Sequence, residues 1–208
     1  MNHARMIGGR EVTLECSDRF EPAAKNVLET LETLDARGPA LHDGSRIQFG
    51  WSVLTLKSDG EGLRVHEPDF DGDPLGDVRA NLDTSLDVLV QQVNVLRGSG
   101  LPGEDVSFSD AVFVQGRALE APNVFLMRQK PAADGDSGWY VGNLDDVDNT
   151  RGAEPEAVRV YELLRRRPCL LKVLTLPPSY AVTVQGDTIT GVMDPEGHNH
   201  YDETSPAG

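Results

Sequence analysis

Residues 123–142 read NVFLMRQKPAADGDSGWYVG, two apolar runs separated by a polar stretch that contains proline and glycine. The runs Asn123–Gln129 and Trp139–Gly142 are rich in β-branched and aromatic side chains, which favour β-strands. Pro131–Gly138 has the composition of a turn. Strands joined by short turns pair antiparallel, so an antiparallel sheet is the first expectation for this part of the chain.

The rest of the chain supplies further strand pairs and several helices. Tyr180–Val184 and Thr188–Val192 flank a turn that contains glycine and predict a hairpin, and so do Arg46–Lys57 and Leu63–His66. Apolar residues at helical spacing, together with prolines in first turns, predict the helices. The predicted helices are 21–37, a long helix capped by Asp73-Pro74 and reaching Leu96, a helix from Pro155 whose last turn holds Arg165–Arg167, and a short one at 169–174.

Together these elements indicate an α+β protein with mostly antiparallel sheets and helices packed on one side. Two lobes of similar style are expected, because the order strand, turn, strand, acidic loop and proline-initiated helix occurs in each half. The predicted division is an N-terminal α+β domain over 1–103, a second α+β domain over 104–193 and a flexible tail over 194–208.

The chain of 208 residues contains 34 acidic and 19 basic residues, a formal net charge of −15. Such a charge repels phosphates and anionic lipids, so neither nucleic acid nor a membrane is expected as a partner. The apolar runs are far shorter than the roughly 20 residues of a membrane helix. Met1–Glu15 lacks the pattern of a secretory leader, which predicts a cytoplasmic protein, and Cys16 and Cys169 are expected to be reduced.

The negative charge is concentrated in two segments. Residues 59–87 hold nine acidic and two basic residues, and residues 134–156 hold seven acidic residues and one basic residue. The densest run, Glu67–Asp73, leaves three interpretations open: a divalent-cation site, a loop that faces a partner, or a solvated loop in which Asp73 caps a helix. An EF-hand does not fit, because Gly72 stands at the fourth position of such a loop rather than the sixth.

The sequence contains no GxSxG nucleophile motif, no HExxH metal motif and no GxxxxGK[ST] phosphate-binding loop. We therefore expect a protein that is not an enzyme and needs no cofactor. Two alternatives stay open. One is a small hydrolase that uses dispersed carboxylates as acid and base, and the other is a non-catalytic adaptor protein.

Part of the second half, about residues 108–186, resembles a known family. The motifs that carry the resemblance are FSDAV at 108–112, NVFLMRQ at 123–129, DSGW at 136–139 and GNLDD at 142–146, with Asn149 in the acidic loop that follows. Their order is similar to that of the bacterial immunity protein thirty-three family. The resemblance implies an immunity protein that binds and neutralises a toxin of interbacterial competition, such as a type VI secretion effector.

The charge gives an independent argument for a protein partner. Many toxins that act in the cytoplasm are nucleases with basic clefts, and an acidic inhibitor can place carboxylates where phosphates would lie. Trp51 and Trp139 are expected to pack in the core, with an interface anchor as the alternative. The candidate partner-binding residues are Glu67, Asp69, Asp71, Asp73, Asp134, Asp136, Trp139, Asp145, Asp146 and Asp148.

Overall fold

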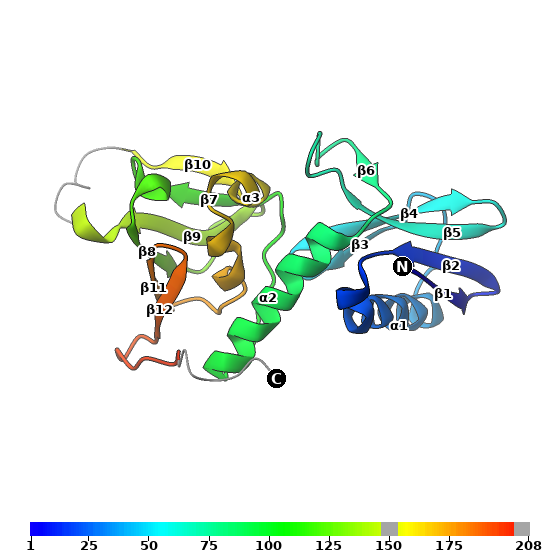
Figure 1. The fold of residues 1–208 in the computed structure, drawn as a ribbon, viewed down its shortest axis with the longest axis horizontal. Coiled ribbons are helices and arrows are strands. Elements are labelled where there is room, and N and C mark those ends of the chain that lie inside the picture. The colour runs from blue at the N-terminus through cyan, green and yellow to red at the C-terminus, as the bar shows by residue number, and fades with distance from the viewer. Residues whose placement is uncertain (147–153, 202–208) are drawn as a thin grey trace. The chain divides into compact units, whose positions relative to one another are not determined.

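The computed structural model describes residues 1–146 and 154–201. The chain forms two compact units, Met1–Val90 and Gln91–Gly208 (Figure 1). Each unit has its own sheet with helices beside it, so the α+β class and the two sheet lobes are confirmed. The division between the units falls inside helix α2 (Asp83–Ser99), and the sequence-based boundaries at residues 103 and 193 stay predictions.

Unit 1 contains a six-stranded mixed sheet with the order β1-β2-β5-β4-β3, in which β6 also pairs with β5. The strands are β1 (Asn2–Ile7), β2 (Arg10–Glu15), β3 (Arg46–Phe49), β4 (Ser52–Asp59), β5 (Gly62–Pro68) and β6 (Val78–Arg79). The predicted hairpin is confirmed for β4 and β5, but its predicted first strand, Arg46–Lys57, is interrupted after Phe49 and forms the two antiparallel strands β3 and β4. The β1–β2 hairpin is absent from the sequence prediction, although its Gly8-Gly9 turn, in which both residues have positive φ, is a typical hairpin signal.

Helix α1 (Glu21–Arg37) has the predicted bounds, and its apolar side packs on the unit 1 sheet (Figure 1). Pro22 stands in the first turn, where a missing N–H breaks no helical hydrogen bond, and Gly38 follows the last residue. The core contains Ala24, Val27, Leu28 and Leu31 from the helix and Val12, Leu14, Leu54, Leu56, Leu63 and Val65 from the sheet. This face of the sheet is therefore the interior of unit 1.

The second long helix, α2, begins later than predicted, at Asp83 rather than at Asp73. Asp73 does not cap a helix, because its carboxylate accepts the N–H of Leu75 in a tight turn and the Leu75 side chain is 55% exposed. Val78–Arg79 then pairs with β5 as strand β6. The helical spacing before residue 83 is misleading, because pairing with an existing strand satisfies this backbone instead.

Unit 2 contains a six-stranded sheet with the order β10-β7-β9-β8-β11-β12. Its strands are β7 (Ala111–Val114), β8 (Asn123–Arg128), β9 (Asp136–Asn143), β10 (Glu156–Arg159), β11 (Ala181–Gln185) and β12 (Thr188–Met193). Strands β7 and β9 are parallel and the other pairs antiparallel. The inner face of this sheet packs on the 3₁₀ segment η5 (Pro168–Val173), at the site of the predicted short helix.

The helix predicted from Pro155 to Arg167 forms only over its last part, where Arg165 and Arg166 lie in the last turn as predicted. Its first part is strand β10 instead, followed by the short helix α3 (Leu163–Arg166). Within β10 Val158 alone is buried, a pattern that suits an edge strand with one covered face. Arg167 lies beyond α3 and is only 7% exposed. Its guanidinium donates to backbone carbonyls instead of standing at a solvated helix end.

The segment after β12 folds back on the strand. Asp194 accepts the N–H of His198 at 2.8 Å, and its other oxygen lies 2.8 Å from Nε2 of His200. The hydrogen bond to His200 lowers the pKa of Asp194, with smaller contributions from His198. The first part of the predicted tail 194–208 is thus a hydrogen-bonded turn, and residues 202–208 lie outside the described residues. None of the helices described is long and apolar enough to cross a membrane.

Candidate functional site

The acidic run of unit 1 leads into a surface turn between β5 and β6, residues 69–77, which we call the acidic turn. Asp69 accepts the N–H of Asp71 at 3.2 Å, and Asp73 accepts an N–H two residues later at 3.0 Å, so both carboxylates stabilise the turn itself. Asp71 forms an ion pair with Arg79. Three predicted partner-binding residues thus share one turn, with Asp71 and Asp73 exposed and Asp69 partly exposed.

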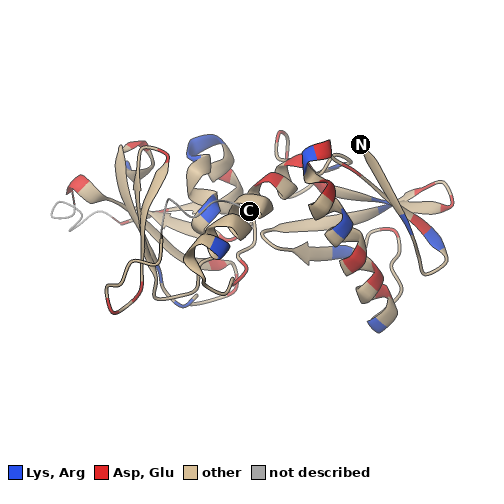
Figure 2. Cartoon of the chain, turned by 60° about the horizontal axis from the view of Figure 1, so that its bottom comes forward, with Lys and Arg blue, Asp and Glu red and all other residues tan. Residues whose placement is uncertain are grey.

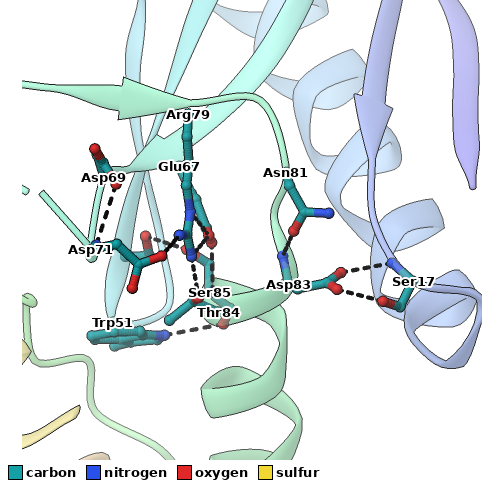
Figure 3. Close-up of polar contacts among 11 residues, drawn as sticks. Ser17, Trp51, Glu67, Asp69, Asp71, Arg79, Asn81, Asp83, Thr84 and Ser85 are labelled. Atoms are coloured by element: carbon teal, nitrogen blue, oxygen red, sulfur yellow. Dashed lines mark hydrogen bonds and ion pairs between the residues drawn. The ribbon is translucent and has the colours of Figure 1, made fainter. Parts of the chain in front are cut away.

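Glu67 lies at the base of the acidic turn and is fully buried (Figure 3). One carboxylate oxygen accepts a hydrogen bond from Nε of Arg79 at 2.9 Å and forms an ion pair with a terminal nitrogen of the same guanidinium at 2.8 Å. The other oxygen accepts the N–H of Ser85 at 2.7 Å. Since Ser85 stands in the first turn of α2, Glu67 connects β5, β6 and the positive end of the helix. A buried carboxylate offers no surface to a partner, so Glu67 supports the acidic turn from inside.

We expect Glu67→Gln to change how stability depends on pH. Burial raises the pKa of Glu67 above its usual value of 4.5, although hydrogen bonds from Ser85 and Arg79 act in the opposite direction. The carboxyl group of Glu67 therefore binds its proton more tightly in the folded protein than in the unfolded chain. The stability contributed by Glu67 is therefore complete below about pH 4.5 and declines as the pH rises through the folded-state pKa. Urea unfolding curves between about pH 4 and pH 8 should lack this decline in the variant.

The control for this measurement is Asp73→Asn, which changes an exposed carboxylate of the same turn. This variant should keep the decline of the wild-type protein. If the free energy of unfolding depends on pH in the same way in the wild-type protein and in Glu67→Gln, Glu67 is not the group responsible for the decline.

In unit 2, two predicted aspartates lie where strand β9 begins. Asp136 accepts the N–H groups of Ala132 and Gly138, both at 2.8 Å. These bonds close the turn that carries the exposed Asp134. Both carboxylates therefore stand at the end of the sheet where β8 leads into β9.

Two more predicted aspartates lie where β9 ends. Asp145 and Asp146 are exposed in the 3₁₀ turn η3 (Leu144–Asp146), which is red beside the grey trace in Figure 2, and Asn123 donates to Asp145 at 3.0 Å. Because β9 has eight residues, the two pairs are roughly 25 Å apart. They bracket the strand rather than form one cluster. Asp148, also predicted, lies outside the described residues.

Both tryptophans are core residues with no exposed surface. The indole N–H of Trp139 donates to the carbonyl of Leu174 at 2.8 Å, and that of Trp51 donates to the carbonyl of Ser85 at 3.1 Å. The structure therefore favours the core interpretation for both rings. Trp139 presents no surface to a partner, in contrast to its place among the predicted contact residues.

The outer face of the unit 2 sheet, opposite the face that packs on η5, carries an apolar row. Cross-strand pairing places its members side by side over all six strands, because paired residues point to the same face. In spatial order they are Ala157, Phe113, Tyr140, Met127, Ala181 and Met193. Phe113 is 37% exposed and Met127 is 42% exposed. This row is absent from the sequence prediction, although apolar residues on both sides of a strand, as in AVFV at 111–114, are a signal for it.

A hollow of about 380 Å³ opens on this outer face. Its lining includes Phe113, Met127, Tyr140, Lys130, Asp136 and Gly138. Gly138 has a φ of 75°, and a Cβ there would lie 2.1 Å from the carbonyl oxygen of Gln129. The backbone at this position therefore requires glycine, because a side chain would collide with the backbone of the turn that begins at Gln129.

A profile of the Imm33-like domain matches residues 91–195, half of the chain. The chain belongs to the Imm33-like domain family. The match begins at the first residue of unit 2 and extends on both sides of residues 108–186, where the sequence motifs resemble this family. The comparisons found no matching curated protein and no matching solved structure.

The Imm33-like domain contains the outer face, the hollow and the aspartates at both ends of β9, whereas the acidic turn lies outside it. Within residues 1–146 and 154–201, no group of three or more His, Cys, Asp or Glu side chains is placed to hold a metal ion. The cation interpretation of the acidic run therefore has no support from the described geometry.

Proposed function

We propose that this Imm33-like protein is an immunity protein that binds one cognate bacterial toxin in the cytoplasm and blocks it by direct contact. The observation that carries the proposal is the family match, which spans the whole sheet of unit 2. The exposed carboxylates at the two ends of β9 support it, because they provide charge for recognising a partner without belonging to the core.

The charge favours a cationic toxin, and we propose a nuclease delivered by a type VI secretion system. A nuclease cleft that binds phosphates is basic, and a protein with a net charge of −15 is attracted to it at long range. Carboxylates that occupy the cleft exclude the substrate. Because exposed charges are screened by salt, apolar contacts must supply part of the affinity.

The proposal is tested by co-expression with the protein product of the neighbouring gene, scored for survival and for a 1:1 complex. We expect Asp145→Lys/Asp146→Lys to weaken that complex about 10- to 100-fold and to reduce its salt dependence. Asp69→Lys/Asp71→Lys tests whether the acidic turn also contributes to the affinity for the toxin.

The matched control is Glu11→Lys/Glu61→Lys, which makes the same change in net charge at exposed positions of unit 1. This variant should bind nearly as well as the wild-type protein. Death of cells that contain soluble wild-type protein together with the toxin would refute the proposed function.

A further inference from the structure

We infer that the outer face of the unit 2 sheet binds the cognate toxin through an apolar side chain flanked by basic residues, an assignment that rests on the proposed function. Three features carry it. They are the apolar row across the strands, the hollow next to Tyr140 and the carboxylates at both ends of β9.

The apolar row faces water in the described structure. Phe113 and Met127 are the neighbours of Tyr140 across the central strand β9, and both are more than one-third exposed. Phe125 adds a ring whose centroid lies 6.0 Å from that of Tyr140. Apolar groups gathered on one exposed face mark contact surfaces, and aromatic and methionine side chains are enriched at the centres of such contacts.

The hollow gives this face a place for one inserted side chain. Phe113, Met127 and Tyr140 supply apolar walls, and its volume of about 380 Å³ accommodates a large apolar group. Lys130 and Asp136 also line the hollow, and because their charges have opposite signs they offset each other. The hollow therefore offers mainly apolar contact. An apolar anchor in such a pocket is the usual centre of binding energy at a protein interface.

The surrounding charge indicates which kind of partner supplies the anchor. Asp134 and Asp136 stand at one end of β9, and Asp145 and Asp146 stand at the other. Basic residues on both sides of the anchor would complement these carboxylates. A second copy of this chain is disfavoured, because a two-fold pairing through the apolar row would bring carboxylates of the same kind toward each other in a protein with a net charge of −15.

The test is the variant Phe113→Thr/Met127→Thr, measured by calorimetric titration with the purified product of the neighbouring gene. Threonine suits an exposed strand position, so the fold should be kept, and circular dichroism checks this. We expect the affinity to fall about 10- to 100-fold. Met6→Thr, which removes a 61% exposed methionine from strand β1, should leave it unchanged.

The outcomes separate the two proposals. If the wild-type protein binds and the folded double variant binds equally well, the assignment of this face is wrong while the proposed function stands. If the wild-type protein does not bind the toxin or rescue cells, both proposals fail. If the free wild-type protein is a dimer and Phe113→Thr/Met127→Thr makes it monomeric, the face pairs copies of this chain and the toxin assignment is overturned.

Discussion

Replacing Arg167 with methionine is expected to lower the free energy of unfolding by about 3–5 kcal/mol. The residue is 7% exposed, and its side chain bears two terminal nitrogens that donate to backbone carbonyls. The acceptors are Ala118, Leu119, Ala121, Pro122 and Gly186. Methionine fills much of the same space but donates nothing, so these carbonyls would lose a partner where water does not reach them. Urea unfolding followed by circular dichroism measures the loss.

The adjacent Arg166 provides the matched control. Its side chain is 36% exposed and forms an ion pair with Glu156, with nitrogen and oxygen 3.2 Å apart. Because an exposed ion pair contributes little, Arg166→Met should change the free energy of unfolding by less than about 1 kcal/mol. Equal losses in the two variants would contradict the proposed role of the Arg167 guanidinium.

Replacing Trp139 with alanine is expected to cost about 3–5 kcal/mol of stability as well. The ring has no exposed surface, and its N–H is hydrogen-bonded to the carbonyl of Leu174 at 2.8 Å. The substitution would leave a cavity between strand β9 and the segment that follows η5, and it would leave that carbonyl unpaired. Circular dichroism suits this measurement better than fluorescence, because the substitution removes one of the two tryptophans of the chain.

Trp139→Phe separates packing from hydrogen bonding at this site. It keeps an aromatic ring but removes the N–H, so we expect a smaller loss of about 1–2 kcal/mol. Urea unfolding of both variants, followed by circular dichroism, measures the two losses. Equal losses in Trp139→Ala and Trp139→Phe would contradict a contribution from packing of the ring.

Turn residues and helical spacing predicted the elements whose ends are set by neighbouring residues in the sequence. The bounds of α1 follow from Pro22, Gly38 and the helical spacing between them. The β4–β5 and β11–β12 hairpins follow from their turns, whereas the β1–β2 hairpin was not predicted. The prediction failed at residues 73–82, which form a turn and the short strand β6, and at residues 156–159, which form the edge strand β10. Whether such a segment pairs with a strand depends on an edge supplied from elsewhere in the chain.

The candidate site was predictable in part. The sequence predicted that the acidic residues are concentrated in two segments. In the structure, the aspartates of the second segment lie on the surface at the ends of β9. The apolar row was not predicted, because apolar residues on both sides of a strand do not show which side is covered. Which side of a strand is covered depends on the packing of η5, a contact that no local pattern shows.

The sequence by itself determined the α+β class, the family and the net charge, because composition, turn residues and ordered motifs are properties of the chain. The tertiary structure alone decided that Glu67 is inside and that Phe113, Tyr140 and Met127 share an outer face. The physical reason is that burial results from contacts between distant segments. Glu67 is buried by Arg79 and Ser85, and the apolar row is assembled from six separate strands.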